Sequence, residues 1–135
     1  MGILLHRAHR RLDAIASELV ASSGLTARQF QVLVGVVFQG PCSQHLIGDK
    51  LGIDGATLTG VVNRLEQRGL LKRLQHPTDR RARHLAATSA GQRLVLEEQA
   101  DFPARADAQL LRQLTEDERE DLRRLLGKIA FHTAD

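Results

Sequence analysis

The sequence is poor in aromatic residues and cysteine, and it contains no long hydrophobic run. Its 135 residues include four Phe but no Trp or Tyr, which argues against a protein that stacks nucleic-acid bases on aromatic side chains. The single cysteine, Cys42, can form no disulfide within the chain. No apolar run approaches the roughly 18 residues of a membrane-spanning helix, and the first residues do not resemble a signal peptide. We therefore expect a protein of the reducing cytoplasm, without membrane association.

Patterns for catalysis, metal binding and redox chemistry are also missing. Only His6 and His9, among six histidines, have the spacing of a metal-ligand pair, and no Cys/His cluster accompanies them. No phosphate-binding loop or nucleophile turn is present, because the glycine-containing stretches are expected helix ends. Cys42 has no second cysteine to resolve it and is expected to be a small half-buried residue. We expect no enzymatic activity, no cofactor and no metal.

Charge is unevenly distributed along the chain. Residues 50–88 carry eight Lys and Arg against three Asp and Glu, whereas residues 97–121 carry three against nine. Sixteen of the nineteen cationic residues are arginine, whose guanidinium pairs with phosphate and guanine through two parallel hydrogen bonds. Uneven charge alone fits either a solvated surface or a face that binds polyanions. The local order of elements has to decide between the two.

Apolar spacing and capping residues predict four helices in the first half of the chain. Residues 4–22 carry a helical stripe, made of Leu5, Ala8, Leu12, Ile15 and Leu19. Thr26, Ser43 and Asp54 are expected N-caps of the next three helices. The glycines expected at helix ends are Gly24, Gly40, Gly52 and Gly69. The third and fourth helices are separated by about three residues, which indicates a helix-turn-helix unit.

A hairpin follows the helix-turn-helix directly, which makes it a winged version of the motif. Two short strands are predicted at 70–74 and 84–87 around a turn at 76–83. Three arginines of this turn (Arg80, Arg81 and Arg83) are expected over a minor groove, which is narrow and strongly negative in A·T-rich DNA. Asp79 is expected to pair with one of them and to anchor the wing.

The remaining sequence predicts helices that have no partner inside the winged lobe. A helical stretch at 89–113 contains Pro103, which either bends the helix or begins a new one. Thr115 and Glu118 form a capping box for a last helix. We expect a single domain over 1–135, mainly α with a small β-wing, in which 25–88 form the lobe. Residues 1–24 and 89–135 are expected to pair with a second copy, giving a homodimer for two DNA half-sites.

The fourth helix has the pattern expected of a helix that enters a DNA groove. Its outward face is small and hydroxylated and lacks the Glu and Lys of a solubilising face over 55–63. Thr57 and Thr59 suit phosphates, bases and the thymine methyl group, Asn63 suits adenine, and Arg64 suits guanine or phosphate. The predicted DNA-binding residues are Ser43, Gln44, Gly55, Thr57, Thr59, Asn63, Arg64, Arg80, Arg81 and Arg83.

Three segments together resemble the MarR family of winged helix-turn-helix regulators. They are 25–33 (LTARQFQVL), 55–71 (GATLTGVVNRLEQRGLL) and 79–91 (DRRARHLAATSAG). The resemblance implies a homodimer that represses a promoter and releases it when a small molecule binds between the DNA-binding lobe and the dimer helices. It also implies that Thr57, Thr59, Asn63 and Arg64 contact the groove. Asp79 and Arg81 match the family's wing signature, in which the acid anchors the loop.

The first helix is the candidate effector site. Its cationic and titratable residues His6, Arg7, His9 and Arg10, beside Phe30, Val34 and Phe38, could hold a carboxylate and the flat ring attached to it. This part resembles MarR members that sense aromatic acids. The alternative is a basic helix that contacts the DNA backbone or an acidic neighbour at the dimer interface.

The function predicted from the sequence is a transcriptional repressor that binds a palindromic operator in double-stranded DNA and is released by a small aromatic carboxylate. Two alternatives stay open. One is a nucleoid-type DNA-binding protein that has no effector, and the other is a winged-helix module for protein contact.

Overall fold

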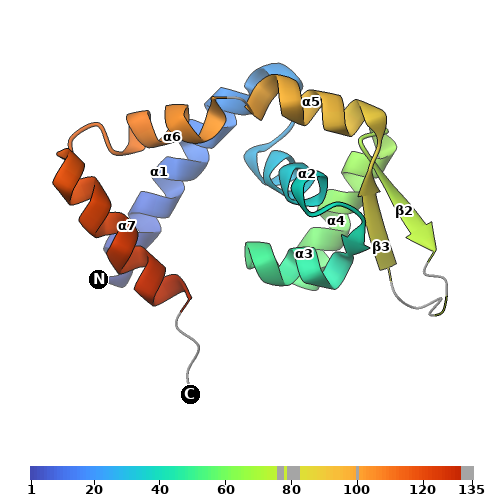
Figure 1. The fold of residues 1–135 in the computed structure, drawn as a ribbon, viewed down its shortest axis with the longest axis horizontal. Helices are drawn as coiled ribbons and strands as arrows, with labels where there is room; N and C mark the ends of the chain where they lie inside the picture. The colour runs from blue at the N-terminus through green and yellow to red at the C-terminus, as the bar shows by residue number, and fades with distance from the viewer. Residues whose placement is uncertain (76–77, 79–82, 100, 132–135) are drawn as a thin grey trace.

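The protein forms an arch of helices with a small sheet at one end (Figure 1). The structure is a computed structural model that describes residues 1–75, 78, 83–99 and 101–131. Its elements are α1 (Gly2–Val20), a 3-10 turn η1 (Ala21–Ser23), α2 (Ala27–Gln39), β1 (Cys42–Ser43), α3 (Gln44–Leu51), α4 (Gly55–Gln67), β2 (Leu71–Gln75), β3 (Arg83–Ala87), α5 (Ser89–Gln99), α6 (Phe102–Leu110) and α7 (Glu116–Ala130). We call α2–α4 with the sheet the lobe, and α1, α6 and α7 the arm. The predicted fold class, mainly helical with a winged helix-turn-helix, is confirmed.

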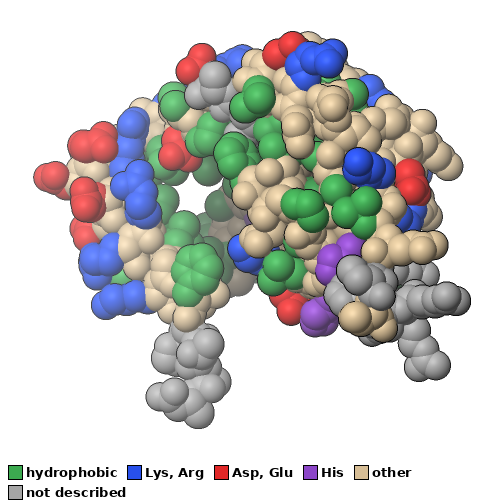
Figure 2. Space-filling view, turned by 45° about the vertical axis from the view of Figure 1, so that its right-hand side comes forward, with side chains coloured by type: hydrophobic (Ala, Val, Ile, Leu, Met, Phe, Trp, Pro, Cys, Tyr) green, Lys and Arg blue, Asp and Glu red, His purple; other side chains and the backbone are tan. Residues whose placement is uncertain are grey.

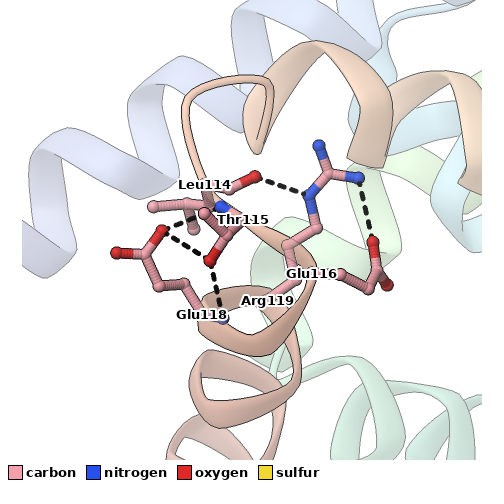
Figure 3. A network of polar contacts seen from close by, with 5 residues as sticks. All are labelled: Leu114, Thr115, Glu116, Glu118 and Arg119. Atoms are coloured by element: carbon pink, nitrogen blue, oxygen red, sulfur yellow. Dashed lines mark hydrogen bonds and ion pairs between the residues drawn. The ribbon is translucent and has the colours of Figure 1, made fainter.

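The predicted N-caps are confirmed. Thr26, Ser43, Asp54 and Thr115 each accept a hydrogen bond from the backbone N–H three residues later, at 2.9–3.3 Å. Such caps satisfy amide groups that the first helical turn leaves without a partner. At Thr115 the cap is reciprocal, because the Glu118 carboxylate accepts from the Thr115 N–H at 2.8 Å (Figure 3). These local contacts set where the helices begin.

The wing contains one strand that the sequence did not predict. The three antiparallel strands lie in the order β1-β3-β2, with Cys42 opposite Leu85 and Ser43 opposite His84. β1 has only two residues, too few for an alternating pattern of apolar and polar side chains. β1 pairs along one side of β3 as an edge strand, and Cys42 is buried there. Burial raises the pKa of the Cys42 thiol, so the reactive thiolate is disfavoured.

Pro103 begins a new helix rather than bending one. α5 ends at Gln99 and α6 starts at Phe102, with Pro103 in the first turn, where a missing backbone N–H removes no helical hydrogen bond. α6 stops at Leu110, so the predicted helical stretch to 113 was three residues too long.

Two apolar clusters hold the molecule together, and Phe102 contacts both. The larger cluster fills the lobe, and the smaller joins Ile15 and Leu19 of α1 to Ala106 of α6. The Phe102 ring lies against Phe30 of α2, with centroids 5.4 Å apart. The two rings are tilted by 51°, and an aromatic pair of this kind stabilises a fold beyond the apolar area that it buries. The arm and the lobe are therefore packed together at this point.

Much of the arm's apolar surface remains exposed to solvent. The exposed large apolar residues include Met1, Ile3, Leu4, Leu5 and Leu12 in the α1 region, and Leu125, Leu126, Ile129 and Phe131 in the α7 region. The start of α1 and the helix α7 both lie at this end of the arch (Figure 1). None of the helices in the described ranges combines the length and apolar character needed to cross a membrane.

Gly91 provides a test of how α5 packs on the lobe. A Cβ at Gly91 would lie 2.2 Å from the Leu70 carbonyl oxygen, whereas a Cβ at Gly60 would have nothing within 4 Å. We expect Gly91→Ala to lower the free energy of unfolding by about 3 kcal/mol. Gly60→Ala, the matched control, should raise it by roughly 0.5–1 kcal/mol. Urea unfolding at one protein concentration measures both, and equal effects would show that α5 is not seated on Leu70.

Candidate nucleic-acid interface

The two sides of α4 differ in burial and chemistry. Leu58, Val62 and Leu65 are buried in the lobe core. The opposite side is exposed and small at its start, and it presents Gly55, Thr57, Gly60, Asn63 and Arg64. A Cβ added at Gly55 or Gly60 would meet nothing within 4 Å. The outer face of α4 is therefore slim enough for a groove of a nucleic-acid duplex.

Thr59 was expected to point outward and Gln44 to contact DNA, but the two residues join α3 to α4. Thr59 is half-buried, and its hydroxyl oxygen accepts a hydrogen bond from Gln44 Nε2 at 2.9 Å. Gln44 is only 8% exposed. Its other amide atom, Oε1, is buried and has no hydrogen-bond partner among the described residues. This hydrogen bond links the two helices of the motif, whose Ile47 and Leu58 also pack together in the lobe core.

Thr57 is both part of the exposed face and part of the α4 cap. Its backbone N–H donates to Asp54 Oδ1 at 2.9 Å, and its hydroxyl donates to Oδ2 at 2.7 Å. The hydroxyl can still accept a hydrogen bond, and its methyl group remains an apolar contact. These bonds, first that from the Thr57 hydroxyl, lower the pKa of Asp54. The resulting carboxylate partly offsets the attraction of the helix N-terminus for phosphate.

Asn63 is bonded to the wing through Arg73, a residue that the sequence analysis did not single out. Arg73 of β2 donates to Asn63 Oδ1 at 2.5 Å and also pairs with Glu66. The Asn63 amide then offers its NH₂ group, a donor that suits the O6 and N7 acceptors of guanine. A contact to adenine, which the sequence analysis assigned to Asn63, would share the amide oxygen that already accepts from Arg73. No sequence pattern marks this contact, because Arg73 and Asn63 lie on different elements.

Two shallow grooves flank α4. The first, about 650 Å³, lies between α3 and the start of α4 and is lined by residues that include Ser43, Gln44 and Thr59. The second, about 250 Å³, lies between the start of α2 and α4 and is lined in part by Thr57 and Arg64. Among the described residues that line these grooves, none belongs to the predicted effector set.

The predicted wing residues fall largely beyond the described chain. Asp79, Arg80 and Arg81 lie outside the described residues, and Arg83 is the first residue of β3 with its side chain likewise outside them. Their roles stay predictions from the sequence.

The predicted effector residues are not gathered in one pocket. His6, Arg7, His9 and Arg10 are exposed on α1, and His9 Nε2 lies 3.3 Å from Asp13. Phe30 is 2% exposed and belongs to the core, because it packs against Phe102.

The other two predicted effector residues lie on α2 in different surroundings. Val34 is half-buried against the lobe core, whereas Phe38 is 71% exposed. An opening rimmed largely by hydrophobic side chains separates the arm from the lobe (Figure 2).

The Asp54 cap gives a pH-dependent prediction. Because the pKa of Asp54 is lowered from 3.8, its contribution to stability is fully present above that value and is lost as the pH falls through the depressed pKa. We expect urea midpoints of wild type and Asp54→Ala to differ most at neutral pH and to converge in acid. Asp54→Asn, which caps without titrating, should differ from Asp54→Ala equally at every pH. A wild-type advantage that persists unchanged in acid would show that the carboxylate is not the cap.

Comparisons with known proteins match the chain to DNA-binding transcriptional regulators. The MarR family profile matches residues 25–82. The HTH-type transcriptional regulator MhqR of Bacillus subtilis is 31% identical over 130 residues, covering 96% of this chain and 89% of MhqR.

Two solved structures match over nearly the whole chain. BpsR of Bordetella bronchiseptica, described with the mechanism by which 6-hydroxynicotinic acid regulates its DNA binding, is 37% identical with a TM-score of 0.87, covering 96% of this chain and 97% of that one. A MarR mutant from E. coli complexed with operator DNA is 26% identical with a TM-score of 0.88, covering 95% and 91%. The chain belongs to the MarR family of DNA-binding transcriptional regulators.

Proposed function

We propose that this regulator is a homodimeric repressor that binds a palindromic operator and is released from it by a small aromatic carboxylate. The observation that carries the proposal is that the lobe and the arm expose surfaces of different chemistry. The lobe exposes the slim polar face of α4, and the arm exposes apolar residues that find no partner among the described residues.

The exposed arm supports a dimer. Leu5 and Leu12 of α1 continue the stripe whose other end, Ile15 and Leu19, is already buried against α6. Full burial of a leucine side chain contributes roughly 1.5–3 kcal/mol, so covering this surface is strongly favourable. A second copy supplies the same apolar residues and gives an isologous contact. Two lobes related by that symmetry suit a palindromic site.

Charge supports an orientation with the lobe towards DNA. The segment 50–88, which contains α4 and the wing, is strongly basic, whereas 97–121 in α5 to α7 is strongly acidic. A polyanion is attracted by the first segment and repelled by the second. Arg64 is exposed beside Thr57 in the second groove, where it can reach phosphate or a base edge.

The effector is proposed from two observations. Arg7 and Arg10 are exposed on the arm, and a guanidinium binds a carboxylate through two hydrogen bonds. The similar protein BpsR is described as regulated by 6-hydroxynicotinic acid, which is itself an aromatic carboxylic acid. A ligand held between the arm and the lobe would change the angle between them, and the α4 helices would then no longer fit both half-sites.

DNA binding is tested with a charge variant on α4. We expect wild type to prefer a palindrome from its own upstream region, and Arg64→Ala to weaken binding and to reduce the salt slope by about 0.9 for each phosphate that Arg64 neutralises. Arg124→Ala is the control, because Arg124 pairs with Asp121 on α7 of the arm. Fluorescence anisotropy over a salt series measures both quantities. A salt slope without sequence preference would indicate a nucleoid-type protein, and no effect of Arg64→Ala would favour a module for protein contact.

The effector is tested with benzoate and 6-hydroxynicotinate as probes. We expect one of them to raise the melting temperature and to release operator DNA, with about 2.7 kcal/mol of stabilisation at one hundred times its dissociation constant. Arg7→Ala should abolish both responses, and Arg93→Ala on α5 should keep them. If neither acid shifts the melting temperature, the aromatic-acid effector is wrong and the DNA-binding function is unaffected.

A further inference from the structure

Arg68 connects the end of α4 to the junction between arm and lobe. It is the C-cap residue of α4. Its Nη1 donates to the Gly24 carbonyl oxygen at 2.8 Å, and its Nη2 donates to the Ser23 carbonyl oxygen at 3.1 Å. Ser23 and Gly24 lie where the chain leaves the α1–η1 segment and enters the lobe. One planar side chain therefore holds two consecutive carbonyl groups of this junction.

The junction is shaped around this contact. Gly24 has a φ of +72°, and a Cβ there would lie 3.4 Å from Nη1 and from Nη2 of Arg68. The Ser23 hydroxyl donates to the Val20 carbonyl at 2.6 Å and accepts from the Leu25 N–H at 3.2 Å. Glycine adopts this positive φ readily, so the chain can turn here. The two hydrogen bonds of the Ser23 hydroxyl hold the turn, and the carbonyl groups of Ser23 and Gly24 then face Arg68.

A second contact fixes the other side of the junction. The Ser22 hydroxyl donates to the Glu98 carboxylate of α5 at 3.2 Å. The junction is thus bound to α4 through Arg68 and to α5 through Ser22. A rotation of the lobe about the junction would have to break the Arg68 contacts.

We propose that Arg68 is a positioning residue for operator recognition, which sets the half-site spacing that the protein accepts. This inference rests on the proposed function as a dimer on a palindrome. When the two arms are held together, each lobe is connected to its arm at this junction and where α5 leads into α6. Arg68 restrains the first of these connections, so it helps to determine where the two α4 helices lie. A change of one base pair rotates one half-site by about 34° relative to the other. A stiff junction therefore rejects the altered spacing.

The chemistry of arginine suits this role. Two N–H groups in one plane fix the direction of a contact, whereas lysine has a single rotatable ammonium group. A cation is also favourable at the C-terminal end of a helix. The competing role for Arg68 is a contact with a DNA phosphate, because it belongs to the basic segment 50–88.

The test uses Arg68→Met, Arg68→Lys and a matched control. Arg119→Met is the control, because Arg119 Nε also donates to a backbone carbonyl, that of Leu114 at 3.2 Å, but in the α6–α7 connection (Figure 3). Affinity is measured for the operator and for versions with one base pair inserted or deleted between half-sites. We expect wild type and Arg119→Met to bind the operator much more tightly than the altered spacings. In Arg68→Met the ratio of these affinities should fall roughly tenfold, and in Arg68→Lys it should fall by less.

The salt dependence separates positioning from phosphate contact. For a positioning residue, the slope of log affinity against log salt is the same in wild type and Arg68→Met. A slope reduced by about 0.9, or spacing discrimination equal to that of wild type, overturns the proposal.

A measurement without DNA tests the hinge directly. A spin label at Gly60→Cys, where a side chain has open space, reports the distance between the two α4 helices of the dimer. Arg68→Met should broaden this distance distribution and Arg119→Met should not, and an unchanged distribution in Arg68→Met overturns the proposal. Wild type that binds no duplex overturns the proposed function and this inference with it. A sharp wild-type spacing profile that persists in Arg68→Met overturns this inference alone.

Discussion

The burial of one side of α4 is the constraint on which the rest of the interface depends. Leu58, Val62 and Leu65 recur at helical spacing and fill the lobe core, so the opposite side of a rigid helix has to face solvent. That side carries the small and hydroxylated residues that a nucleic-acid groove admits. Neighbouring elements then use some of the hydrogen-bonding groups of α4. Gln44 of α3 donates to Thr59, and Arg73 of β2 donates to Asn63.

The arm and the lobe have different apolar clusters, and two sets of contacts connect them. Phe102 contacts both apolar clusters through Phe30 on one side and the arm residues on the other. Arg68 joins the end of α4 to the junction at Ser23 and Gly24. A signal that alters the arm can therefore reach α4 through these two connections.

Features that depend on neighbouring residues in the chain could be predicted from the sequence. The caps at Thr26, Ser43, Asp54 and Thr115 and the left-handed glycines follow from local hydrogen bonding and backbone sterics. The basic wing segment and the helix-turn-helix spacing are also local. These features were sufficient to predict the fold class and most of the outer face of α4, but not that Thr59 is half-buried.

Contacts between distant elements could not be predicted. Nothing in the sequence pairs Gln44 with Thr59 or Arg68 with Ser23, and β1 is too short for any pattern. Periodicity also does not tell which apolar residues face the chain's own core. Leu5 and Ile15 share one stripe of α1, yet they are 42% and 8% exposed. For the same reason Phe30, assigned to an effector pocket, instead packs in the core.

In the proposed complex, two copies of this chain present their α4 helices to one duplex. Hydroxyl-radical footprinting of the operator complex, with the mass of the same complex, tests it most directly. The account predicts two chains per duplex and two protected segments whose centres lie about 10–10.5 base pairs, or a multiple of that, apart. One chain per duplex, or a single protected segment, would contradict it.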